Sequence, residues 1–156
     1  MSLLQSSGNE YMAKSELHKK LQEDAVYWLY KNGCEIFADE VGVDGGYIID
    51  VVGIKRNGDT FCVEVKATQE DLDKARQEGY SQTNHFFNYH YLYLPIELEL
   101  KNAWDGWGIV RDFKSIRKAK RQTSHLHFSE LTKLMFDVAG KLAREKYFNN
   151  FRDTYE

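Results

Sequence analysis

The sequence predicts an α/β fold, a three-layer sandwich in which a central mixed β-sheet is flanked by helices. Two observations predict this class. Segments with helical periodicity open and close the chain, and apolar, β-branched runs bounded by turn signals lie between them. The segments follow the order helix, three strands, helix, strand, strand, helix, which lacks the regular alternation of an all-parallel sheet.

Composition places the chain among single-domain globular proteins. Its 156 residues suit one core, and 42% hydrophobic with 29% charged residues is ordinary for such domains. No apolar run approaches the roughly 18 residues that a membrane span needs, and the first residues do not resemble a secretion signal. We therefore expect a cytoplasmic protein with no membrane partner. Residues 1–10 should form a flexible head and residues 11–156 one domain.

Periodicity and turn signals place the elements along the chain. Helices are expected at residues 14–31, 68–84 and 129–148, and strands at 34–41, 47–54, 60–66, 89–95 and 106–111. The two cysteines cannot build a disulfide framework or a convincing zinc site, so both should be reduced core residues. The last helix should carry one apolar stripe, made of Leu131, Leu134, Met135, Val138, Leu142 and Ala143.

Three charged residues interrupt the apolar strands. Asp50 lies in a run of Ile and Val, and Glu64 and Lys66 lie in the next strand. A buried charge is costly unless a partner charge or a metal ion offsets its desolvation. Because residues two apart in a strand share a face, Glu64 and Lys66 lie together, with the Val65 carbonyl between them. The pattern favours a shared polar site.

Whether Asp50 joins this face depends on the hairpin loop. A two-residue loop of Asn57 and Gly58 would pair Asp50 with Val65, which is the wrong face. A three-residue loop that also includes Asp59 would pair Asp50 with Lys66, with Gly58 left-handed in a bulge, and a bulge within either strand would serve equally well. We predict that one of these arrangements exists.

On a common face, the Asp50 and Glu64 carboxylates and the Val65 carbonyl are hard oxygen ligands. Such ligands suit Mg²⁺, with Mn²⁺ as the alternative. Lys66 would then orient or help to deprotonate a water nucleophile and stabilise the negative charge that develops on a phosphate. A structural alternative is a buried ion cluster in which Lys66 pairs with Asp50 or Glu64 and no metal binds.

Asp50, thirteen intervening residues and Glu64-Val65-Lys66 resemble the signature of the PD-(D/E)xK nuclease superfamily. The spacing alone is a weak signal, but the element order over roughly residues 15–111 is similar to the core of that superfamily. Ile49 stands where that signature often has proline. The resemblance implies a restriction endonuclease-like fold and metal-dependent hydrolysis of DNA.

The same resemblance implies supporting residues. Glu23 on the first helix would support the metal through water, although a solvated helix face explains it equally well and is favoured for Glu16. Gln77, followed by Tyr80, resembles the Gln and Tyr that several nuclease branches carry after the lysine. The pattern is also similar to the MmcB-like DNA-repair branch, which implies a small bacterial or phage protein acting on damaged or branched DNA.

The net charge of −3 argues against a protein that binds nucleic acid over its entire surface, so a local basic patch matters more. One segment before the last helix is basic without acidic residues, and we expect it to contact DNA phosphates. A solvated loop is the alternative. Its members are Lys114, Arg117, Lys118, Lys120 and Arg121.

The sequence thus predicts a Mg²⁺-dependent deoxyribonuclease working in DNA repair, recombination or phage DNA processing, with Asp50, Glu64 and Lys66 as its main catalytic residues. Glu23 and Gln77 are its second-tier candidates. The competing hypothesis is a nuclease-like fold that binds DNA or a protein partner with weak or absent cleavage. Pairing of two chains into a homodimer is left open.

Overall fold

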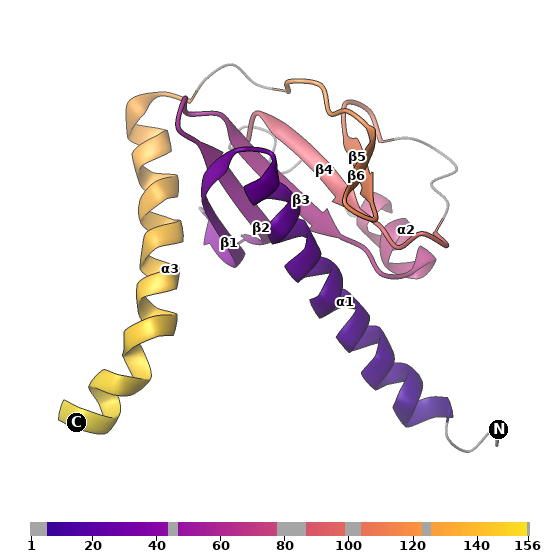
Figure 1. Ribbon diagram of the computed structural model, residues 1–156, viewed down its shortest axis with the longest axis horizontal. Coiled ribbons are helices and arrows are strands. Elements are labelled where there is room, and N and C mark those ends of the chain that lie inside the picture. The colour runs from indigo at the N-terminus through magenta and orange to yellow at the C-terminus, as the bar shows by residue number, and fades with distance from the viewer. Residues whose placement is uncertain (1–5, 44–46, 78–86, 99–103, 123–125, 156) are drawn as a thin grey trace.

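The computed structural model describes residues 6–43, 47–77, 87–98, 104–122 and 126–155 (Figure 1). They form an α/β fold in which three helices pack on a six-stranded mixed sheet. The helices are α1 (Ser6–Lys31), α2 (Gln69–Gln77) and α3 (Phe128–Tyr155). The strands are β1 (Cys34–Val43), β2 (Tyr47–Lys55), β3 (Thr60–Val65), β4 (Tyr89–Tyr93), β5 (Gly108–Arg111) and β6 (Lys114–Arg117).

The strands lie in the sheet in the same order as in the chain, β1 to β6. β1, β2 and β3 form an antiparallel meander, β3, β4 and β5 run parallel, and β6 returns antiparallel to β5. Because β3, β4 and β5 are parallel, their carboxyl ends meet at one edge of the sheet. Side chains near these strand ends are therefore brought together from distant parts of the sequence.

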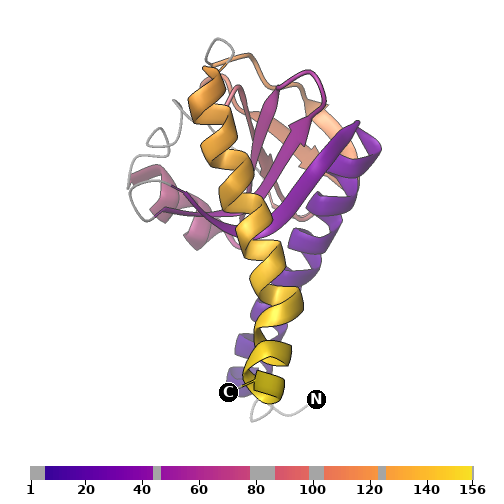
Figure 2. The ribbon, with the colours of Figure 1, turned by 90° about the vertical axis from the view of Figure 1, so that its left-hand side faces the viewer.

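The helices cover both faces of the sheet. α1 packs on one face, where Ala25, Trp28 and Leu29 join a core with Val51 and Val63. α3 covers part of the other face, and in Figure 2 this helix lies in front of the sheet. A third cluster joins Leu72 of α2 to the two tryptophans that precede β5. The sheet thus has a core on each side, as a three-layer arrangement requires.

The hairpin between β2 and β3 decides the geometry of the predicted site. Val52 pairs with Cys62 and Ile54 with Thr60, and the Lys55 amide donates to the Asp59 carbonyl at 2.9 Å. The loop therefore has three residues, 56–58, and Gly58 has a φ of +95°. A three-residue loop was expected, but as 57–59. The left-handed residue is the last of the three in this hairpin form, which moves the loop one residue earlier.

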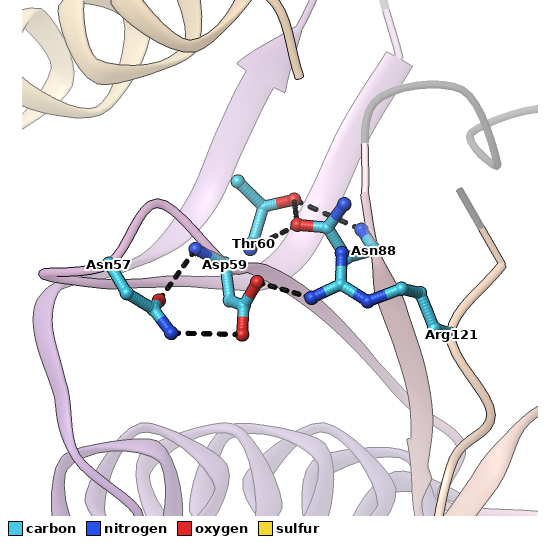
Figure 3. A network of polar contacts seen from close by, with 5 residues as sticks. All are labelled: Asn57, Asp59, Thr60, Asn88 and Arg121. Atoms are coloured by element: carbon cyan, nitrogen blue, oxygen red, sulfur yellow. Dashed lines mark hydrogen bonds and ion pairs between the residues drawn. The ribbon is translucent and has the colours of Figure 1, made fainter. Parts of the chain in front are cut away.

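A polar network holds the turn end of the hairpin (Figure 3). The Asp59 amide donates to Asn57 Oδ1 at 2.9 Å, and Arg121 donates to Asp59 Oδ1 at 2.5 Å. The buried Asn88, just before β4, accepts from the Thr60 amide at 2.8 Å. These contacts tie the turn to β4 and to the segment after β6, so the hairpin register is fixed from both sides.

Several element boundaries differ from those expected. α1 begins at Ser6, so residues 6–10 are helical instead of belonging to a flexible head. Strong helix formers such as Glu10, Met12 and Ala13 let the helix extend toward the N-terminus. β6 was not expected at all. Its side chains are exposed or only partly buried, so this edge strand lacks the apolar alternation that marks a strand.

α3 differs from the prediction in its apolar surface. Leu134 and Val138 are buried against the sheet and Leu131 packs beside them, but Met135 and Leu142 are exposed. Ala143 is exposed as well. The single predicted stripe is therefore two faces, because apolar residues on two sides of a helix resemble one broad stripe in the sequence.

Two expectations from composition can be compared with the structure directly. Cys34 and Cys62 are both buried, as predicted. Within the described ranges, no helix has both the length and the apolar character that crossing a membrane would require.

Replacing Gly58 tests the hairpin geometry. Gly58→Ala should lower the free energy of unfolding by about 1–2 kcal/mol, because a left-handed φ disfavours any residue with a Cβ. Crowding would not cause this loss, since the new Cβ would meet only Leu131 Cδ2 at 3.6 Å. Gly42→Ala is the matched control, because its Cβ would enter open space. Urea denaturation of both variants measures the difference, and an equal effect of the two would contradict the assignment.

Candidate active site

Asp50 and Glu64 converge at the end of the β2–β3 ladder. The last paired residues are Val51 and Val63, and one further step along both strands sets Asp50 opposite Glu64. The two side chains are close enough for Asp50 to raise the pKa of Glu64. The predicted common face is therefore present, although the sequence paired Asp50 with Lys66 and the structure sets it opposite Glu64.

Around Asp50, hydrogen bonds that involve side chains replace the backbone pairing of β2 with β3. The Val65 amide donates to Asp50 Oδ2 at 2.9 Å, and the Gln22 side-chain amide donates to the Asp50 carbonyl at 3.1 Å. Gln22 is buried, and it reaches β2 from the third turn before the end of α1. These two bonds hold the Asp50 backbone and carboxylate at the splayed end of the hairpin, so the carboxylate has a fixed direction.

The surroundings of Glu64 perturb its carboxyl group. Burial raises its pKa well above the usual value, and the nearby Asp50 carboxylate raises it further by repulsion and by a hydrogen bond. Lys66 and the Cys62 thiol, whose Sγ lies 3.8 Å from Glu64 Oε1, act in the opposite direction and offset only part of the effect. The site therefore favours either a proton or a cation between the two carboxyls.

Lys66 lies beside a polar pocket of about 340 Å³. His18 of α1 and Asp71, Lys74 and Ala75 of α2 complete the lining with Val65. The Lys66 amide donates to the Tyr93 carbonyl at 3.2 Å, which extends the β3–β4 pairing past the end of β3. The pocket thus lies at the carboxyl edge of the sheet, and its lining includes Lys66, Lys74 and His18, which contacts Asp50.

The donor set fits a divalent cation of the kind predicted. Asp50 and Glu64 supply oxygen from two strands, and burial together with the nearby Asp50 carboxylate raises the pKa of Glu64, which a cation would offset. Within the described residues, however, no three His, Cys, Asp or Glu side chains are grouped to hold a metal. The ion would therefore depend on two carboxylates, with further oxygen from a backbone carbonyl, water or a phosphate. The role of the Val65 carbonyl stays a prediction.

A buried ion cluster is a poor account of these charges. The contact that Asp50 makes with a basic side chain is to His18, whose Nε2 lies 3.9 Å from Asp50 Oδ2. In the part of the chain that is described, Lys66 makes no comparable direct pair with Asp50 or Glu64 and lowers the pKa of Glu64 from a greater distance. The lysine is therefore not committed to neutralising either carboxylate.

The supporting residues on α1 differ from the predicted one. Glu23 and Glu16 are exposed, whereas His18 and Gln22, four residues apart, contact Asp50. The sequence contained a signal for Gln22, because it lies seven residues before the buried Leu29 on the core-facing side of the helix. Gln77 ends α2, but its side chain lies outside the described part of the chain, as does Tyr80.

The basic segment runs away from the site. Lys114 pairs with Arg111 near the carboxyl edge of the sheet, but β6 is three strands from β3, roughly 14 Å away at usual strand spacing. Arg121 lies at the opposite end, where it pairs with Asp59 and covers the Tyr89 ring at 5.1 Å. Lys118 and Lys120 are exposed. The segment is thus a strip along the sheet edge and does not surround the carboxylates.

A solved structure shares this fold. It is described as the SPO1766 protein of unknown function from Silicibacter pomeroyi, and it matches 90% of this chain and 95% of its own with a TM-score of 0.74. The sequences are 16% identical, a level at which the likeness shows the fold alone. No protein-family model matches the chain, and no curated protein does.

The pH dependence of stability tests the electrostatics of Glu64. Because its pKa is raised, the folded state retains a proton that the unfolded state releases, so stability falls as pH rises above the usual carboxyl range. Without added metal, Glu64→Gln should therefore be more stable than the wild type at pH 7, by about 1.4 kcal/mol per unit of raised pKa. This difference in stability should disappear below about pH 4, where the Glu64 carboxyl is protonated in both the folded and the unfolded state.

Thermal unfolding between pH 4 and 8 measures this gap. Glu130→Gln, on an exposed turn of α3, is the control and should follow the wild type throughout. A Glu64→Gln protein that is no more stable than the wild type at pH 7 would show that Glu64 is not under electrostatic strain.

Proposed function

We propose that the chain is a Mg²⁺-dependent nuclease, with Mn²⁺ as an alternative ion, that hydrolyses phosphodiester bonds of DNA. The observation that carries the proposal is the Asp50–Glu64 carboxyl pair, held at a strand end with Lys66 beside it. The parallel strands β3 and β4 and the flanking helices support a restriction endonuclease-like core of the PD-(D/E)xK kind. Work in DNA repair, recombination or phage DNA processing is part of the same proposal.

Asp50 and Glu64 would hold the ion, which supplies a Lewis acid that polarises the phosphoryl oxygen when bound. The Val65 amide and Gln22 keep the Asp50 carboxylate directed at that place, so little reorganisation is needed on binding. Relief of the repulsion between the two carboxylates favours the cation further.

Lys66 would act on the phosphate and on the attacking water. Lys66 lines the pocket and is close enough to Glu64 to lower its pKa, so its ammonium would orient a water molecule and stabilise charge that develops on the phosphoryl oxygens. Lys74 of α2 lines the same pocket and would hold a neighbouring phosphate. His18 would position Asp50 through their 3.9 Å contact.

The exposed basic strip along β6 would bind the DNA backbone beyond the cut site. Lys114 lies at the same edge of the sheet as the carboxylates, and Lys118 and Lys120 continue away from it. Arg121 contributes less, because its guanidinium already pairs with Asp59 and Tyr89. Such contacts fix position on the duplex and carry no sequence information.

Cleavage assays test the nuclease proposal. Purified protein is incubated with linear, single-stranded and branched DNA in Mg²⁺ or Mn²⁺, and products are separated on denaturing gels. Glu64→Ala and Lys66→Ala should each lower the cleavage rate at least about 100-fold, because each removes charge stabilisation in the transition state. Glu130→Ala and Lys31→Ala, both exposed and distant from the strand ends, should cut like the wild type.

Two outcomes separate the enzyme from the competing binding module. If the wild type cuts none of these substrates but binds DNA as tightly as Glu64→Ala and Lys66→Ala, the fold serves binding alone. If cleavage survives in Glu64→Ala, the catalytic centre lies elsewhere or a contaminating nuclease is responsible.

The salt dependence of DNA binding tests the basic strip. Each phosphate contact contributes about 0.9 to the slope of log K against log salt concentration, so Lys118→Ala with Lys120→Ala should reduce the slope by roughly 1.8. Fluorescence anisotropy with a labelled duplex at salt concentrations from about 50 to about 200 mM measures this slope. Lys31→Ala is the control. An unchanged slope would place the DNA-binding surface away from β6.

A further inference from the structure

We propose that the outer face of α3, together with the groove between α3 and β1, is an interface where two copies of this chain form a homodimer. The proposal does not depend on the nuclease function, since this surface involves none of the residues of the carboxylate site. The occupant it commits to is α3 of a second copy, packed antiparallel to the first.

α3 has a second apolar face that nothing in the described chain covers. Phe128 and Phe136 are 86% and 74% exposed, and Met135 and Leu142 are also exposed. Phe128, Met135 and Leu142 recur every seven residues, which aligns them along one side of a helix. This side is distinct from the one that places Leu134 and Val138 in the core.

A groove of about 730 Å³ runs beside this face. Its walls are almost entirely apolar, with Ile36 and Phe37 from β1 on one side and Met135, Phe136 and Leu142 from α3 on the other. α3 is held in this position by Lys141, which donates to the carbonyl and the carboxylate of Asp39 on β1. The groove is therefore a fixed feature of the fold.

The exposed apolar area is close to what a stable dimer needs. The four aromatic residues on the outer side, Phe128, Phe136, Tyr147 and Phe151, are 86%, 74%, 43% and 52% exposed. At 150–250 Å² for each whole side chain, they present roughly 400–600 Å². Met135, Leu142 and the groove wall bring this toward the roughly 800 Å² that each partner of a stable interface buries.

The outer face of α3 is complementary to itself. Two 28-residue helices placed antiparallel about a two-fold axis between Ala139 and Gly140 set Phe128 of one chain opposite Phe151 of the other. Phe136 then lies opposite Ala143, so a large side chain meets a small one near the middle. A two-fold arrangement closes on itself, which produces a dimer and no further assembly.

The location of β1 adds a reason for the interface to exist. β1 is the outermost strand of the described sheet, and an exposed edge strand invites uncontrolled pairing with other chains. A second copy seated over the groove would shield Ile36 and Phe37 beside that edge. The dimer would thus cover both the apolar helix face and the edge of the sheet.

The oligomeric state of the full chain tests this proposal. Sedimentation velocity over about 1–100 μM should show the wild type as a dimer of about 36.6 kDa, twice the 18.3 kDa of one chain. Phe136→Glu should weaken association at least about 30-fold, because it places a charge in the interface. Ile116→Glu alters another exposed apolar residue, 62% accessible, on the opposite edge strand and should leave the dimer intact.

A cross-linking experiment tests the antiparallel arrangement. Ala139→Cys, next to the two-fold axis, should form an interchain disulfide under mild oxidation, whereas Ile116→Cys should not. Circular dichroism of each variant shows whether the fold is kept, which is expected because these positions are exposed. A monomeric wild type at 100 μM, or binding of the Phe136 face to lipid vesicles by monomers, would overturn the proposal.

Discussion

The hydrogen bond from the Val65 amide to the Asp50 carboxylate is the contact on which the candidate site depends. In a continuing antiparallel ladder this amide would bond to a backbone carbonyl of β2. Here the amide donates to the Asp50 side chain instead, and the Asp50 carbonyl accepts a hydrogen bond from the Gln22 side chain. The strands therefore part at Asp50, the residue that carries one of the two candidate metal ligands, and its carboxylate is itself held in place.

The hairpin loop and the contacts around it determine the register at this strand end. The three-residue loop with left-handed Gly58 fixes the parity of the hairpin, so that Asp50 and Glu64 share a face. The polar network of Asp59, Asn88 and Arg121 (Figure 3) secures the far end of the same hairpin. Five residues of strand separate Asp59 from Glu64, which corresponds to roughly 17 Å. A slip of one residue at the turn would separate the carboxylates, which is why a distant loop controls the site.

Charges inside apolar strands made the central trio of the site visible in the sequence. Strand alternation then placed Glu64 with Lys66, and a three-residue loop placed Asp50 on the same face. The predicted partner of Asp50 was Lys66, whereas the register sets it opposite Glu64. His18 and Gln22 were missed because periodicity gives the buried side of α1 but not which strand that side meets. β6 and the second apolar face of α3 were missed for a related reason. Exposed edges and surfaces awaiting a partner carry no core-facing pattern.

Anomalous diffraction from crystals grown with Mn²⁺ tests the central claim most directly, because it locates the ion without relying on activity. The account predicts one strong manganese peak between Asp50 and Glu64, at roughly 2.0–2.3 Å from a carboxylate oxygen of each, and its loss in Glu64→Gln crystals. A protein saturated with Mn²⁺ that shows no peak there, or a peak bound by other residues, would contradict the account.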